Sequence, residues 1–390
     1  MDWTLYFNAL DKEQLDFFFP ETENRIGNKI AIYTEENFPE LEDVKIVILG
    51  VEESRNANNN IGSAAAPNAI RKQFYRLYFH ENMPKIADIG NLKIGQQIGD
   101  TYFVLGEIVA KLVENDIIVV ILGGSQDLTY GNYLAYQQLN KVINITSIDA
   151  KFDIGESEKE IRSDAYINKI ILSQPNYLFN YSNIGYQSYF VDNKDIELMN
   201  KLYFDAQRLG VSKSDILNCE PIIRNANLVT VDMSAVRFAD SPGCPHCSPN
   251  GFTGEEICTL AHYAGGSDRL SSFGIYEYNP ELDIHNQGAI LIAQMLWYFI
   301  QGVMLRCNDL PDISKGNFYK YTVSLFNDTY QIVFYKSKTS QLWWMEIPVE
   351  EGENVKFNKN YIIPCSIKDY QTACNDEVPE RWLQTYKKIK

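Results

Sequence analysis

Residues 142–155, VINITSIDAKFDIG, constrain the fold of this chain more than any other segment. The segment begins as a β-branched apolar run, which is typical of a parallel strand buried on both faces of a sheet. Asp149, Lys151 and Asp153 follow at every second position, and this spacing predicts that their side chains share one side of the chain. Open α/β sheets bind ligands at the carboxyl ends of their strands. The segment therefore predicts a parallel sheet with a charged site at this edge.

Strands alternate with helices through the middle of the chain. Further short apolar strands are predicted at residues 44–50, 117–122, 227–236 and 271–280. Helices of ten residues or more are predicted at residues 101–114, 195–210 and 289–305. This alternation predicts an α/β fold with a doubly wound, mainly parallel sheet and helices on both faces.

The sequence divides into three regions. Residues 1–43 are acidic and aromatic, and we expect them to form an N-terminal covering segment. Residues 44–310 contain the alternating strands and helices. Residues 311–390 contain aromatic, β-branched runs separated by NDT and KTS, which predict a β-rich C-terminal extension: an antiparallel meander followed by a short helix. We expect this extension either to pack on the main core or to bind a protein partner or a second copy of the chain.

The charge of the chain limits its partners. A formal net charge of −16 argues against nucleic acid or an anionic membrane, because both need a basic surface on the protein. We recognise neither a signal peptide nor an apolar run near eighteen residues, so we expect no membrane span and a cytoplasmic location. Seven cysteines without a regular framework indicate reduced thiols rather than disulfides.

Four ordered motifs relate the chain to a known family. They are GGSQDLTYGNY, DAKFD, VDMSA and EYNPELD. The set resembles the GG(D or G)H, DAHxD, DxD and ExNPxxD motifs of the ureohydrolases, the family of arginases, agmatinases and formimidoylglutamases, with the formimidoylglutamases the nearest branch. The resemblance covers about residues 40–305 and implies an arginase-like fold. It also implies hydrolysis of a carbon-nitrogen bond in a linear amidine such as formimidoylglutamate, and assembly into trimers or hexamers.

The resemblance further implies a site for two manganese ions with six ligand positions. In this chain the six positions are Gln126, Asp149, Lys151, Asp153, Asp232 and Ser234. Three carboxylates remain, whereas Gln126, Lys151 and Ser234 replace two histidines and an aspartate. Family roles imply that Lys151 and Ser234 stand where one of the ions has its own ligands. That ion has therefore lost both of its own ligands. Without the second ion, the water that two ions activate together is lost as well.

The residues leave two interpretations of this pocket open. In the first, the ammonium group of Lys151 replaces the charge of the metal and holds together carboxylates that otherwise repel one another. In the second, Asp149, Asp153, Asp232 and the amide oxygen of Gln126 bind one Mn²⁺, Mg²⁺ or Ca²⁺, since hard ions accept oxygen ligands. The sequence favours the metal-free interpretation, because a neighbouring Lys⁺ disfavours a bound cation.

Two further features are candidate sites. Glu277 stands where the family binds the cationic end of its substrate, and we expect it to bind a small cationic ligand or to form a structural salt bridge. Residues 241–252 contain Cys244 and Cys247 in a CPHC turn that is expected to overhang the pocket. This turn is an unspecialised loop, a reversible disulfide or, with His246, an incomplete zinc site.

The sequence thus supports two classes of function. The first is a non-catalytic relative of the ureohydrolases that acts as a scaffold, a regulatory subunit or a sensor of a small cationic molecule. The second is an active formimidoylglutamase-like hydrolase that uses a single metal or an altered site. The simultaneous changes at Gln126, Lys151 and Ser234 favour the first class.

Overall fold

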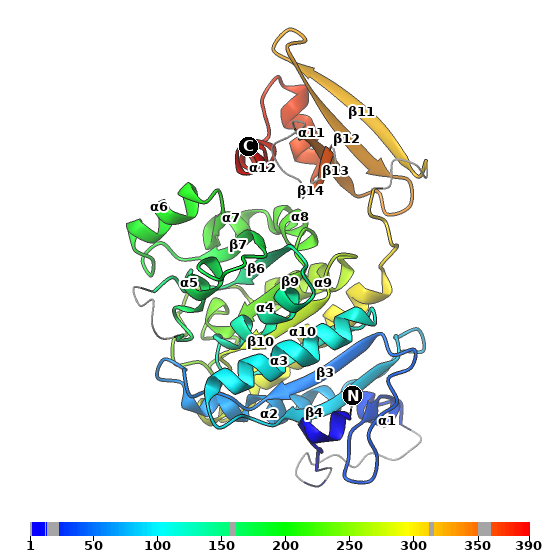
Figure 1. The fold of residues 1–390 in the computed structure, drawn as a ribbon, viewed down its shortest axis with the longest axis vertical. Helices are drawn as coiled ribbons and strands as arrows, with labels where there is room; N and C mark the ends of the chain where they lie inside the picture. The colour runs from blue at the N-terminus through cyan, green and yellow to red at the C-terminus, as the bar shows by residue number, and fades with distance from the viewer. Residues whose placement is uncertain (1, 12, 14–22, 156–160, 312–315, 350–359) are drawn as a thin grey trace.

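A ten-stranded sheet forms the centre of the molecule (Figure 1). This computed structural model describes residues 2–11, 13, 23–155, 161–311, 316–349 and 360–390. The strand order is β1-β4-β3-β5-β10-β9-β6-β7-β8, with β2 beside β4, and every pairing except β1 with β4 is parallel. The strands are β1 Phe7–Asn8, β2 Ala31–Ile32, β3 Ile46–Val51, β4 Ile86–Leu92, β5 Ile118–Gly123, β6 Ile143–Ile148, β7 Leu178–Tyr186, β8 Asp205–Arg208, β9 Leu228–Asp232 and β10 Ser272–Tyr276. The predicted mainly parallel sheet is confirmed. Two short strands of the N-terminal segment, β1 and β2, extend it at β4.

Helices cover both faces of this sheet, as predicted. They are α1 Ile26–Lys29, α2 Ala66–Phe74, α3 Ile98–Glu114, α4 Leu128–Gln138, α5 Tyr166–Ile171, α6 Asn193–Lys201, α7 Leu209–Ser214, α8 Glu220–Arg224, α9 Gly254–Gly266 and α10 Gln287–Met304. Alternate residues of β3 belong to two separate hydrophobic cores, because successive side chains of a strand point to opposite faces. Ile46 and Ile48 share a core with α2, α9 and α10, whereas Val47 and Leu49 share the other with α3 and α4.

Helix α10 is the most apolar long helix of the fold. Among the described residues it is the one helix that is long and apolar enough to cross a membrane, and 61% of it is buried inside the protein. It packs against α9 and α2. Its apolar side chains thus pack in the core between these helices.

The prediction of a helix at residues 195–210 is wrong for its second half. Helix α6 ends at Lys201, and Tyr203 then adopts a φ of 51°. A tyrosine in this left-handed region cannot continue a right-handed helix. The chain continues instead as the edge strand β8 and the short helix α7.

The C-terminal extension forms a second, antiparallel sheet with the order β11-β12-β13-β14. Its elements are β11 Phe318–Leu325, β12 Tyr330–Ser337, β13 Trp343–Pro348, β14 Asn360–Cys365, α11 Ile367–Cys374 and α12 Glu380–Ile389. The extension has a small hydrophobic core of its own, to which both helices and all four strands contribute residues. The predicted meander and final helix are confirmed, and β14 and α11 were not predicted.

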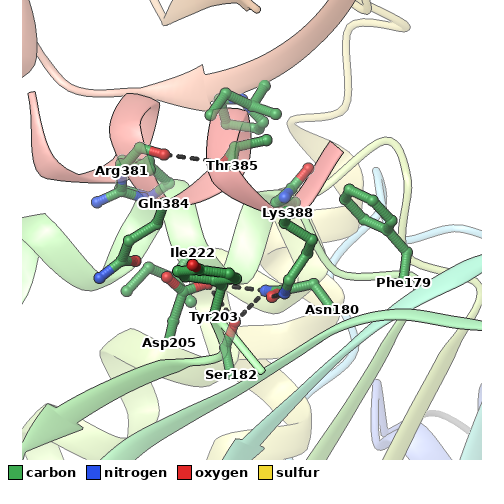
Figure 2. Close-up of a pocket in the computed structure, with 14 residues that line it drawn as sticks. Phe179, Asn180, Ser182, Tyr203, Asp205, Ile222, Arg381, Gln384, Thr385 and Lys388 are labelled. Atoms are coloured by element: carbon green, nitrogen blue, oxygen red, sulfur yellow. Dashed lines mark hydrogen bonds between the residues drawn. The ribbon is translucent and has the colours of Figure 1, made fainter. Parts of the chain in front are cut away.

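The extension packs on the main sheet at the amino ends of its strands. Lys388 of α12 donates a hydrogen bond to Asn180 near the start of β7, as Figure 2 shows. Arg224, at the end of α8, donates from Nη2 to the backbone oxygens of Trp343 and Cys365 at 3.0 and 3.1 Å. These contacts lie at the edge opposite to the carboxyl ends of the strands, so the extension does not cover that edge.

Candidate metal centre

Three buried carboxylates meet where β6 and β9 end. These strands are neighbours in the sheet and run in parallel. Asp232 is the last residue of β9, and Asp149 and Asp153 follow β6 directly. Carboxylate oxygens of the three residues lie within 4.8 Å of one another, and all three residues are buried. The edge of the sheet that the sequence indicated therefore contains a cluster of carboxyl groups.

Hydrogen bonds fix one oxygen of two of these carboxylates. Oδ1 of Asp149 accepts from the backbone N of Lys151 at 2.8 Å, and Oδ1 of Asp232 accepts from the backbone N of Ser234 at 2.6 Å. Oδ2 of Asp149 and Oδ2 of Asp153 are buried without a hydrogen-bond partner among the described residues. Buried polar atoms are normally satisfied, so two free oxygens in one pocket indicate room for a donor or a cation.

Gln126 lies in the turn after β5, at the same edge of the sheet as these carboxylates. Its side-chain Nε2 donates to the hydroxyl groups of Tyr166 at 3.2 Å and Thr230 at 3.0 Å. These two contacts fix the amide so that Oε1 is the free atom, and Oε1 is buried without a described partner. Sequence reasoning did not single out Tyr166 or Thr230, since neither belongs to a motif with a charged residue at that position.

Burial and mutual repulsion disfavour the ionised form of these carboxylates. The pKa of Asp149 is raised to about 8, mainly by burial and next by the nearby charge of Asp232. Burial is also the largest cause of the raised pKa of Asp153 and of Asp232, and for Asp153 the charges of the other two add to it. A cation in the pocket stabilises the ionised forms, and its absence favours protonation.

Lys151 lies outside direct contact with the three carboxylates. Its Nζ stands 6.0 Å from the centre of the Phe190 ring, and it forms no ion pair with Asp149, Asp153 or Asp232 in the described part of the chain. The alternation that predicted one shared side fails here, because β6 ends at Ile148 and Asp153 adopts a φ of 52°. The charge of Lys151 still lowers the pKa of each carboxylate from a distance.

Glu277 follows β10 and is buried beside the same pocket. Its Oε1 accepts from the backbone N of Gln126 at 2.9 Å, and its Oε2 accepts from Nδ2 of Asn60 at 2.7 Å. Both partners are neutral, and the structural salt bridge that the sequence allowed is not found among the described residues. The pKa of Glu277 is raised to about 8, mainly by burial and next by the charge of Asp232. The Asn-rich loop before α2, which supplies Asn60, gave no signal beyond its composition.

The CPHC turn approaches the pocket from the loop after β9. Sγ of Cys247 donates to the backbone oxygen of Ser241 at 3.0 Å, and Nε2 of His246 is 2.8 Å from the backbone oxygen of Asn58. The turn contains no cluster of three metal-ligating groups in the described ranges. Contact with Cys247 and burial raise the pKa of the Cys244 thiol well above its ordinary value. A raised thiol pKa favours an unreactive cysteine.

The sequence profile of the arginase family matches residues 44–301. This chain belongs to the arginase family. It is 24% identical over 267 residues to the formimidoylglutamase of Lysinibacillus sphaericus (strain C3-41), which covers 64% of this chain and 81% of that protein. It is 26% identical over 257 residues to the formimidoylglutamase of Staphylococcus carnosus (strain TM300), with 62% and 81% covered. The family resemblance read from the four motifs is confirmed.

Solved structures share the fold of this arginase-family protein. The formimidoylglutamase of Bacillus subtilis superposes with a TM-score of 0.66 at 18% identity, over 74% of this chain and 94% of that one. The formiminoglutamase of Trypanosoma cruzi with Mn²⁺ gives 0.63 at 15% identity, over 73% and 100%. At such identities the likeness shows the arginase-like fold. The family match ends before the C-terminal extension.

Two of the six positions that the resemblance assigns to a pair of manganese ions have weak donors in this chain. A protonated lysine has no lone pair to donate to a metal, and Ser234 offers a neutral hydroxyl where a carboxylate is needed. The remaining oxygens of Gln126, Asp149 and Asp153 do fit one hard divalent cation, because each is buried and lacks a partner among the described residues.

Proposed function

We propose that this member of the arginase family has lost the binuclear manganese centre and acts without catalysis, as a scaffold, a regulatory subunit or a binding protein for a small molecule. The observation that supports this proposal is the pair of residues at the second ion's own ligand positions. Lys151 turns to Phe190 instead of the carboxylates, and Ser234 contributes its backbone N–H to Asp232. Neither side chain is suited to bind a metal ion.

The histidines and Tyr166 supply no proton-transfer group at this pocket in the described part of the chain. The chain has four histidines, His80, His246, His262 and His285. Only His246 belongs to a loop that reaches the pocket, and its Nε2 is bonded to the backbone oxygen of Asn58. The Tyr166 hydroxyl accepts a hydrogen bond from Nε2 of Gln126 at 3.2 Å, and burial raises its pKa well above the ordinary value, so it stays protonated and does not act as a base. Neither supplies the acid-base function that amidine hydrolysis needs.

One observation favours a second candidate function. Asp149, Asp153 and Asp232 bring carboxylate oxygens within 4.8 Å of one another, and Oε1 of Gln126 is buried without a described partner. These oxygens are the ligand type that one Mn²⁺, Mg²⁺ or Ca²⁺ accepts. Such an ion acts as a Lewis acid towards a bound linear amidine. In that case Gln126 and the three carboxylates position the cation, and Glu277 faces the cationic end of the substrate. The protein is then a formimidoylglutamase-like hydrolase with an altered site.

Metal binding and turnover of the purified full-length protein separate the two candidates. We expect no release of product from formimidoylglutamate, arginine or agmatine with added Mn²⁺. The triple substitution Gln126→His, Lys151→His and Ser234→Asp is expected to bind two Mn²⁺ per chain, because it restores the family's ligands. Wild-type turnover that disappears in Asp232→Ala, but persists in the surface control Glu107→Ala, contradicts the non-catalytic proposal.

A further inference from the structure

The two edges of the C-terminal sheet differ in what covers them. The edge at β14 faces the α/β domain, where Arg224 and Arg269 each donate to a backbone oxygen of β14 at 3.1 Å. The edge at β11 lies on the outer side of the molecule, as Figure 1 shows. Apart from the ladder with β12, no backbone group of Phe318–Leu325 has a hydrogen-bond partner in the described ranges. The edge at β11 is therefore open.

The pairing of β11 with β12 determines which backbone groups face this open edge. The two strands pair in one unbroken antiparallel register. Directly before β11, the backbone oxygen of Asn317 accepts from the backbone N of Lys338 at 3.0 Å. Successive residues of an antiparallel strand bond alternately to one side and to the other. The residues that direct their N–H and C=O groups away from β12 are therefore Phe318, Lys320, Thr322 and Ser324.

Strand β11 has few of the features that protect an exposed edge from pairing. Protected edges are usually short, contain a bulge or a proline, or have a lysine at the edge. β11 has eight residues, no proline and no bulge. Its one charged residue is Lys320, whose Nζ lies 6.0 Å from the centre of the Tyr335 ring on β12, and so on the inner side of the strand. Exposed rings lie beside the edge instead, with Tyr319 52% exposed and Tyr330, in the adjoining hairpin, 62% exposed. The strand is thus suited to pair with another strand.

The sequence of β11 is complementary to a second copy of itself. A two-fold axis at Tyr321 places Tyr321 opposite its own copy, Lys320 opposite Thr322 and Phe318 opposite Ser324. In this register all the outward residues exchange hydrogen bonds with the facing strand, about eight in total. Lys320 does not face Lys320 of the second copy. Symmetric pairing therefore satisfies the open edge without opposing like charges.

The distribution of charge along the chain also favours a second copy at this edge. Residues 311–390 contain 11 basic and 10 acidic residues, whereas the whole chain has a formal net charge of −16. The excess negative charge therefore belongs to residues 1–310. Association of two extensions through β11 brings nearly neutral surfaces together, and like-charge repulsion between them is small.

We propose that two copies of this chain associate through β11 and form one continuous antiparallel sheet from both extensions. The interface lies outside residues 44–301, which match the arginase family, so it is additional to any assembly of the α/β domain. It also goes beyond the proposed non-catalytic role, because the pairing does not depend on whether the carboxylate pocket is active.

Light scattering of the full-length protein tests this interface. We expect the wild type to have twice the mass of Thr322→Pro, because proline removes an outward N–H and leaves the ladder with β12 intact. Thr322→Lys faces Lys320 of the second copy at two symmetric positions, and we expect the dissociation constant to rise about tenfold. Adding Lys320→Glu to Thr322→Lys is expected to restore association, because the facing charges are then opposite. Asn200→Lys, at an exposed position of α6, is the matched control and is expected to change nothing.

Three results overturn the proposal. The first is a wild-type mass equal to that of Thr322→Pro at every protein concentration up to about 100 μM, since the edge then binds no second copy. The second is equal association of wild type, Thr322→Pro and Thr322→Lys when circular dichroism shows all three to be folded, because another surface then joins the copies. The third is a folded double variant, Lys320→Glu with Thr322→Lys, that associates no better than Thr322→Lys alone.

Discussion

Lys151 affects the pocket through its charge rather than through a contact. It lowers the pKa of Asp149, Asp153 and Asp232 although its Nζ lies over the Phe190 ring. The same field repels a divalent cation, so Lys151→Met is expected to increase the affinity for Mn²⁺ by about three- to tenfold. Electron paramagnetic resonance of free Mn²⁺ measures this change. Lys194→Met removes an equal charge from an exposed position and is the matched control; equal affinities in the two variants contradict the prediction.

The residues of the pocket differ in how far the sequence predicts them. The three carboxylates follow strand ends, and neighbouring parallel strands bring such positions together, so their convergence follows from the pattern. The direction of Lys151 does not, because β6 ends at Ile148 and the alternation of a strand no longer applies at residue 151. Asn60, which holds Glu277, comes from a loop 217 positions away. Only the folded chain shows such a pair.

The contact between α8 and the second sheet depends mainly on Arg224. Its side chain is 6% exposed, pairs with Glu220 at 2.6 Å and lies 4.5 Å from the centre of the Trp344 ring, while Nη2 bonds two backbone oxygens of the extension. Arg224→Met leaves Glu220 and these oxygens unpaired. We therefore expect the extension to unfold in a separate transition, with a free energy of unfolding about 3 kcal/mol lower than in the wild type. Urea unfolding followed by tryptophan fluorescence detects the early transition. Arg237→Met, which breaks a more exposed pair with Asp240, is expected to leave a single transition.

Individual elements show where periodicity is sufficient and where it is not. Helix α3 was predicted within three residues of its start, because its apolar positions repeat regularly, whereas the capping box of Gln97 and Asp100, which sets the true start, was not recognised. Strand β4 was missed, since IADIGNL contains a charge and a glycine in a fully buried strand. Asp88 is tolerated there because Arg71, on α2, binds both of its oxygens at 2.8 and 2.9 Å. A strand whose burial depends on a distant arginine has no local signal.

At the scale of the whole molecule, the joint between the two sheets is expected to respond to pH. Burial lowers the pKa of Lys388 from 10.5 to about 8, only partly offset by Asp205. Between these two pH values the folded protein has released a proton that the unfolded chain still binds. The free energy of unfolding therefore rises with pH in this window, by about 1 kcal/mol after screening. Denaturant titrations at pH 7.5 and 9.5 measure the rise, which is expected to shrink in Lys388→Met and to persist in Lys387→Met, because Lys387 is exposed. Equal rises in both variants contradict the prediction, because they mean that groups other than Lys388 cause the pH dependence.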